Sequence, residues 1–163
     1  MTESVYKFFY KKLYIFSEKS AELFFVFFFS SCISCTQAES RDRLLDQTVE
    51  SYFKVWSKGD MEGYSSIFHK SAVIQYKSRT GQMITEQLSD FIAGQRNAHR
   101  LNPGKMNEIP LEKRYHQNGD TAQVQVRWKL STPNMTATGW DHFTFIRTGG
   151  EWKIIYLYFY SDE

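Results

Sequence analysis

The sequence predicts a single α+β domain, and two observations lead to that prediction. Between residues 41 and 102 the apolar residues recur mainly at three- and four-residue spacing, which is the period of amphipathic helices. Beyond Gly104 apolar and polar residues alternate, which is the period of half-buried strands. Three helices followed by a run of strands indicate an arrangement in which helices cover one face of a strongly curved sheet.

The first helix is expected at residues 41–57 and ends at Lys58-Gly59, where glycine suits a left-handed C-cap. Asp60 can cap a second helix that continues to Phe68. The apolar positions of the first helix are Leu44, Leu45, Val49, Tyr52, Phe53, Val55 and Trp56, and those of the second are Met61, Tyr64, Ile67 and Phe68.

A short strand is expected at residues 72–77, followed by a turn at residues 79–81. Thr85 is then expected to open the third helix, and Asn102-Pro103-Gly104 to end it. The positions that carry the helical spacing are Leu88, Phe91, Ile92 and Gln95. This helix is the last before the pattern changes to period two.

Four strands are expected in the remainder of the chain, at residues 108–117, 121–130, 136–148 and 151–160. Asn118-Gly119 and Gly149-Gly150 are hairpin signals, so the sheet should be mostly antiparallel. The second of these strands places one apolar set on a single face, which we expect to be buried: Ala122, Val124, Val126, Trp128 and Leu130.

Composition excludes two broad classes of protein. The net charge of the 163 residues is +2, with both signs interspersed, so no nucleic-acid surface is indicated. Both cysteines, Cys32 and Cys35, precede the domain, which excludes a disulfide framework within it. We divide the chain into a signal-like segment (1–35), a short linker (36–43) and one domain (44–163).

The signal-like segment has basic residues, then an uninterrupted apolar run from Leu23 to Phe29, then small residues, which is the order of a secretory signal. The run is shorter than the roughly 20 residues of a spanning helix. Residues 29–32 resemble the lipobox of bacterial lipoproteins, which implies lipidation at Cys32, with Cys35 as the alternative. We expect an exported bacterial protein, membrane-anchored or periplasmic; a plain cleaved signal and a cytoplasmic protein with a spurious extension are the alternatives.

Two stretches carry a family resemblance: GDMEGYSSIFHKSAVIQY after the first helix, and DHFTFIRTGGEWKIIYLYFY at the end. In this order, over residues 44–160, the chain resembles the nuclear-transport-factor-2-like superfamily, including its SnoaL-like and ketosteroid-isomerase-like branches. The resemblance implies a cone-shaped α+β barrel, in which a bent sheet wraps a long helix around a pocket. It also implies a homodimer through the outer face of the sheet.

The ketosteroid-isomerase-like branch has three functional positions, and the resemblance assigns two of them. Tyr52 falls at the position of a tyrosine on helix one, and Asp141 at that of an acid on the penultimate strand. Tyr76 falls where the branch has its aspartate base, and a tyrosine with a pKa of about 10 is a poor base at neutral pH. No second carboxylate is evident at that end of the strand, which puts the isomerase reaction in doubt.

Strand alternation places Asp141 with Phe143 and Phe145, which predicts a buried acid. A neutral buried acid and a phenol can both donate hydrogen bonds to a developing oxyanion. His99, near the end of the third helix, is a candidate general base. The expected pocket residues are Tyr52, Trp56, Tyr76, Trp128, Asp141, Phe143 and Tyr156.

Three functions remain open. The first is a module that binds a small hydrophobic ligand or a protein partner, and the missing base favours it. The second is an isomerase, cyclase or dehydratase that uses Asp141 and Tyr52 to polarise a carbonyl. The third is a structural dimer with a filled cone, whose outer face carries Arg127, His142 and Tyr158. No cofactor is expected, and the scattered His69, His116 and His142 predict no metal site.

Overall fold

The computed structural model describes residues 42–78 and 80–162. The signal-like segment, with Cys32 and Cys35, lies outside these described residues, as does nearly all of the linker. Within them, no helix has both the length and the apolar character needed to cross a bilayer. The helices are α1 (Arg43–Ser57), α2 (Met61–Ser66) and α3 (Leu88–Leu101); the strands are β1 (Phe68–Lys77), β2 (Met83–Gln87), β3 (Asn107–Asn118), β4 (Thr121–Ser131), β5 (Thr136–Thr148) and β6 (Glu151–Ser161).

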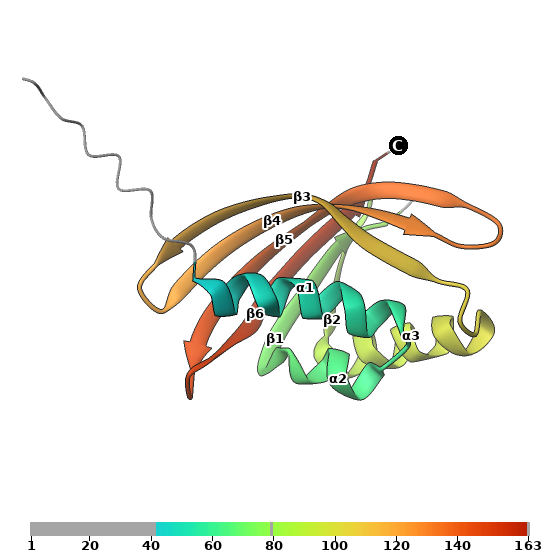
Figure 1. Cartoon of the computed structure of the whole chain (residues 1–163). Helices are drawn as coiled ribbons and strands as arrows, with labels where there is room; N and C mark the ends of the chain where they lie inside the picture. The colour runs from blue at the N-terminus through green and yellow to red at the C-terminus, as the bar shows by residue number, and fades with distance from the viewer. Residues whose placement is uncertain (1–41, 79, 163) are drawn as a thin grey trace, which may run out of the picture. The chain divides into compact units, whose positions relative to one another are not determined.

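The six strands form one sheet in the order β2-β1-β6-β5-β4-β3. Every neighbouring pair is antiparallel except β1 with β6, which is parallel. Figure 1 shows the sheet arching over the helices, which all lie on its concave side. The predicted α+β class and the mostly antiparallel, curved sheet are confirmed, although the sheet remains open and does not close into a barrel.

Helix α1 crosses the concave face of the sheet and supplies the centre of the core. Asp42 caps it, because its carboxylate accepts a hydrogen bond from the backbone N–H of Leu44 at 2.8 Å. Gly59 follows with φ of 72°, a left-handed conformation that favours glycine. The helix presents one buried stripe to the sheet: Leu45, Val49, Tyr52, Phe53 and Trp56.

Two boundaries differ from the sequence-based prediction. Helix α2 ends at Ser66, and Phe68 already belongs to β1 instead of to the helix. Residues 83–87 form β2, where the third helix was predicted to have begun at Thr85. Pairing with β1 overrides the helical pattern, since the intervening turn at Ser78 and Gly81 closes a hairpin whose strands exchange backbone hydrogen bonds.

The predicted buried face of β4 is confirmed, and it packs with β5 and β6 against the helices. Phe143 and Phe145 of β5 are 2% and 0% exposed. In β6 the alternation is interrupted by an irregular register opposite Thr144 and Phe145. Ile154 and Leu157 are therefore both buried, whereas Tyr156 is half-buried and turned to the other face.

Candidate functional site

A cavity of about 200 Å³ lies between the helices and the concave face of the sheet. All three helices and strands β3 to β6 contribute to its lining. Its walls are largely aromatic, and Tyr52 is held by ring contacts at 4.9 Å with both Tyr64 and Phe143. The lining residues are Tyr52, Trp56, Tyr64, Phe91, Gln95, Glu108, Trp128, Leu130, Asp141, Phe159 and Ser161.

Asp141 is the acid of this cavity, and it is buried as strand alternation predicts, with 3% of its surface exposed. It lies opposite Val126, so Trp128 is its diagonal neighbour on the concave face. Among the described residues, neither Oδ2 of Asp141 nor the indole Nε1 of Trp128 has a hydrogen-bond partner. A buried polar atom that stays unpaired destabilises the folded state by about 1–3 kcal/mol.

Gly139 sets the position of the Trp128 indole. The two residues are opposite each other in the β4–β5 pair. A Cβ atom at position 139 would overlap the six-membered ring of Trp128 and the carbonyl oxygen of Tyr160. The glycine therefore allows the indole to lie close against β5, on the strand that carries Asp141.

Glu108 is a second carboxyl group in the cavity lining, and the sequence analysis did not find it. Ser57 fixes its backbone, since the Ser57 hydroxyl accepts from the Glu108 N–H at 2.8 Å and donates to the Glu108 carbonyl at 3.0 Å. Burial raises the pKa of the Glu108 carboxyl to about 8. Only its register opposite Leu130, an inward position of β4, distinguishes it from the solvated charges farther along β3.

Burial shifts the two carboxyl groups of the cavity toward their uncharged forms. Burial raises the pKa of Asp141 well above its usual range, and the negative charge of Glu108 raises it further. Trp128 and Tyr52 lie near enough to favour the carboxylate and partly offset this rise, although the geometry at Trp128 Nε1 falls short of a hydrogen bond. Burial also raises the pKa of Tyr52 and Tyr64.

Four of the seven expected pocket residues line the cavity: Tyr52, Trp56, Trp128 and Asp141. Phe143 packs behind Tyr52. Tyr76 stacks on Phe159 at 5.1 Å between ring centroids, and its hydroxyl donates to Glu86 at 2.9 Å. It thus supports the wall from outside.

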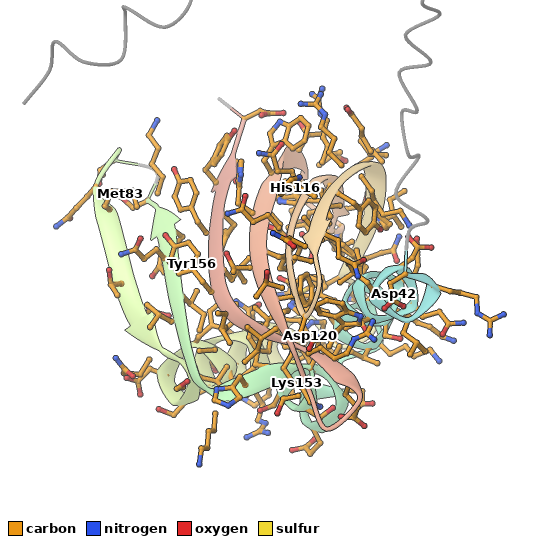
Figure 2. The ribbon with its side chains drawn as sticks, turned by 90° about the vertical axis from the view of Figure 1, so that its left-hand side faces the viewer. Asp42, Met83, His116, Asp120, Lys153 and Tyr156 are labelled. Atoms are coloured by element: carbon orange, nitrogen blue, oxygen red, sulfur yellow. The ribbon has the colours of Figure 1, made fainter. Side chains whose placement is uncertain are left out.

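Tyr156 lies on the opposite face of the sheet from the cavity. The irregular register of β6 turns it outward, where its hydroxyl donates to Gln75 at 2.6 Å. Figure 2 shows Tyr156 between the ribbons of β1 and β6. The sequence-based placement of this residue in the pocket is therefore corrected.

His99 lies behind the cavity wall. Its ring meets the Trp56 indole edge-on, with 4.6 Å between centroids, and it packs beside Gly59, which has no side chain to displace it. Burial lowers the pKa of His99. The other end of Trp56 donates from Nε1 to Gln95 Oε1 at 2.9 Å, so this tryptophan separates the histidine from the acids.

The open curved sheet, the helices on its concave side and the cavity between them form the fold of solved structures that are described as NTF2-like. The chain belongs to the family described as "Putative lumazine-binding", whose sequence profile matches residues 40–160. A search of curated proteins gave no match.

Solved structures of low sequence identity share this fold. A variant of Rv3472, a protein of unknown function from Mycobacterium tuberculosis, aligns with a TM-score of 0.62 at 15% identity, over 73% of this chain and 70% of that one. A protein titled "Putative Scytalone Dehydratase" from Novosphingobium aromaticivorans gives 0.62 at 12%, over 74% and 83%. Bd1075 from Bdellovibrio bacteriovorus gives 0.62 at 15%, over 73% of this chain but only 40% of that one, so this chain spans about two fifths of its length.

Proposed function

We propose that this protein binds a small, flat, uncharged molecule in the cavity beneath the sheet. The observation that carries the proposal is the pair of buried, unpaired polar atoms, Asp141 Oδ2 and Trp128 Nε1. Buried polar groups in native proteins nearly always have partners, and exceptions call for an explanation. A ligand with matching polar atoms would remove the free-energy penalty that these two groups impose on the folded chain.

The size and charge of the cavity limit the ligand. An apolar cavity of roughly 150 Å³ is large enough for benzene, so a cavity of about 200 Å³ accommodates one ring or two small fused rings. Aromatic walls favour a flat molecule, and neutral acids offer no counter-charge to a buried ion. The family description names lumazine, a flat two-ring heterocycle of this kind.

Isothermal titration with lumazine tests the proposal. A Leu130→Trp variant should fill the cavity and abolish binding, because Leu130 is part of the lining. Leu101→Trp is the matched control, since Leu101 is 64% exposed and away from the cavity. Absence of heat with lumazine and other flat heterocycles would contradict the proposed ligand, and unchanged affinity in the Leu130 variant would contradict its location.

A second candidate function is catalysis of proton transfer on a carbonyl compound, and Glu108 is the observation that favours it. The sequence offered no carboxylate base at the Tyr76 position, and Trp56 separates His99 from the acids, but a carboxyl group with a pKa of about 8 can both accept and donate a proton near neutral pH. In this scheme Asp141 and Tyr52 polarise the carbonyl, and Glu108 moves the proton. Deuterium exchange at the α-carbon of a cyclic ketone, followed by NMR, should be lost in Glu108→Gln; no exchange in the wild-type protein would exclude the scheme for that substrate.

The location of the protein is a separate proposal that rests on the sequence. Export with a lipid anchor at Cys32, or at Cys35, follows from the lipobox-like residues 29–32. Mass spectrometry of the membrane fraction should find a diacylglyceryl group on a chain that begins at one of these cysteines. An intact chain from Met1 in the cytosol would overturn the proposal.

The homodimer is also a proposal, and the outer face of the sheet supports it. There the His142 ring lies 5.6 Å from that of Tyr158 and 5.8 Å from that of Tyr160, giving a half-buried aromatic surface. Arg127 on the same face pairs with Asp162 at 3.1 Å. Analytical ultracentrifugation should show a dimer that a Tyr158→Glu variant disrupts, whereas a monomeric wild-type protein would overturn this assignment.

A further inference from the structure

We infer that Asp141 and Trp128 together recognise the edge of a cyclic imide, the O=C–NH–C=O unit of a flat heterocycle. The inference rests on the proposed function and narrows it, because it names the chemical group that the cavity selects. It is carried by the kinds of polar atom that the two side chains offer and by their positions on neighbouring strands.

The first step is the number of donors and acceptors. A neutral carboxyl group offers one O–H donor and one carbonyl acceptor, and an indole offers a single N–H donor. Asp141 Oδ2 and Trp128 Nε1 have no partner among the described residues, so they are the groups that a ligand would engage. In the neutral form of Asp141 the two side chains carry two donors and one acceptor; Oδ2 and Nε1 are without a partner among the described residues, and Tyr52 also lies within reach of the carboxyl group.

The second step is the placement of these groups. Trp128 is opposite Gly139 in the β4–β5 pair, and Asp141 lies two residues beyond Gly139 on the same strand and the same face. Diagonal neighbours of this kind are within reach of one another when one side chain is long or aromatic. The missing side chain at Gly139 lets the indole approach β5, the strand that carries Asp141, and both side chains belong to the cavity lining.

The third step is complementarity. A cyclic imide presents an acceptor, a donor and an acceptor in one plane, which is the counterpart of two donors and one acceptor. A ketone offers acceptors alone and would leave the Asp141 acceptor unpaired, and an aromatic hydrocarbon would leave all three groups unpaired. A site built to hydrogen-bond a ligand rejects analogues that lack the matching group, because its own buried atoms then stay unsatisfied.

The remaining lining residues suit the rest of such a heterocycle. Tyr64, Phe91 and Phe159 supply aromatic surface for the ring faces. Gln95, whose Oε1 is held by Trp56 Nε1 at 2.9 Å, and Glu108 add polar groups elsewhere on the lining. These groups can meet ring nitrogen atoms away from the imide edge.

The experiment compares four probes by isothermal titration at about pH 6, which lies below the Glu108 pKa of about 8. Lumazine and 1-methyllumazine carry the intact imide edge, 3-methyllumazine has the imide N–H replaced by N–CH₃, and quinoxaline has the flat two-ring shape without any imide. We expect the first two to bind about 10- to 100-fold more tightly than the last two. The two methyl isomers have equal bulk, so the comparison isolates the imide N–H.

Two variants of Asp141 place the effect on that residue. Asp141→Asn retains one donor and one acceptor and should keep lumazine affinity within about fivefold. Asp141→Leu should lower the affinity for lumazine to that of 3-methyllumazine while leaving quinoxaline unchanged. Near-UV circular dichroism checks that each variant is folded; if the leucine variant does not fold, the four probes with the wild-type and asparagine proteins decide the question.

The possible results distinguish imide recognition from the more general proposal that the cavity binds a flat ligand. If all four probes bind wild-type protein equally, the cavity is a ligand site but does not recognise an imide, and the inference is overturned. If none binds, the proposed function and the inference fall together. Equal loss of all probes in Asp141→Asn would also overturn the inference, because it would show that a charged aspartate is needed.

Discussion

Two aspartates in this domain lie next to tryptophans, and their surroundings are opposite. Asp42 accepts from the Leu44 N–H at 2.8 Å and from the Trp152 indole at 3.2 Å, and it forms an ion pair with Arg147. The Arg147 guanidinium also lies 4.7 Å from the Trp152 ring centroid. Figure 2 shows Asp42, at the start of α1, at the same end of the domain as Asp120, a second partner of Arg147.

Within the described part of the chain Asp141, in contrast to Asp42, has no cationic partner. Its tryptophan neighbour makes no hydrogen bond with the described residues, and the ionisable side chain that raises its pKa, after burial itself, is a second carboxyl group, Glu108, instead of an arginine that would lower it. The same pair of residue types therefore supports structure at one end of α1 and is left unpaired at the other. Partnered polar groups stabilise a fold, whereas a buried group without a partner is retained against a stability cost and calls for an explanation, which we propose here is a ligand.

The largest expected effect comes from changing the volume beside Trp128. In Gly139→Ala the new methyl group would overlap the Trp128 ring and the Tyr160 carbonyl oxygen, so backbone must move. We expect a loss of about 3–5 kcal/mol in the free energy of unfolding, measured by urea denaturation. Gly94→Ala, where a Cβ meets no atom within 4 Å, is the control and should stabilise helix α3 by about 0.5–1 kcal/mol. A tolerated Gly139→Ala would show that the indole is not held against β5.

The next largest effect is expected from breaking the cluster that Asp42 forms with Arg147 and Trp152. Asp42→Ala removes the cap of α1 and leaves the Arg147 guanidinium and the Trp152 N–H without this partner, so we expect a loss of about 3 kcal/mol. Asp42→Asn can keep the cap through its single amide oxygen but loses the charge and the acceptor for the Trp152 N–H, so it should lose less than the alanine variant. Urea denaturation measures both, and a loss below about 1 kcal/mol for the alanine variant would mean that solvent replaces the cluster.

The pH dependence of stability comes from the unpaired site. Glu108 has a folded-state pKa of about 8, above the ordinary 4.5, so the folded state binds more protons than the unfolded state between these values. Stability should therefore fall as pH rises through this window, by about 2–4 kcal/mol, and level off above it. Glu108→Gln should flatten the decline in thermal unfolding measured across the window. An unchanged decline in the variant would assign it to other groups.

The smallest effect is expected at Asp141 itself. Because burial raises the pKa of Asp141 well above its usual range, the native side chain is shifted toward its neutral form, and Asp141→Asn replaces it with a neutral amide of similar shape. Unfolding free energies of the two proteins should agree within about 1 kcal/mol at neutral pH. A loss as large as that of Asp42→Ala would instead indicate a charged and paired aspartate, and would remove the contrast between the two sites.

Most of the helices and strands could be predicted from the sequence, because the spacing of apolar residues and the residues that favour turns are local features. The alternation of β4 and β5 placed Val126 and Asp141 on the buried face, where both lie. It failed at residues 83–87, since a short strand that exists only by pairing with β1 has no strong pattern of its own. It failed at Tyr156 for a related reason, because the irregular register of β6 depends on its neighbour β5.

The cavity was predicted only in part, and the carboxyl group that the prediction missed was Glu108. From sequence alone, a charged residue near the start of a polar strand is expected to be exposed to solvent. The inward position of Glu108 follows only from its register opposite Leu130. That register is a tertiary property, and so is the burial that raises its pKa. Tyr52 and Asp141 were identifiable because each lies within an apolar periodic pattern, which Glu108 lacks.

The place of β6 in the sheet bears on how the chain matures. This strand, residues 151–161, lies between β1 and β5 and so joins the β2–β1 hairpin to the β5–β4–β3 meander. A ribosome makes β6 after both of those pieces, so the parallel pairing of β1 must wait until the whole intervening chain has been synthesised. Contacts between distant segments slow folding, and the six-stranded sheet cannot be complete until β6 has been made. A chain that completes its fold late is compatible with the export proposed above.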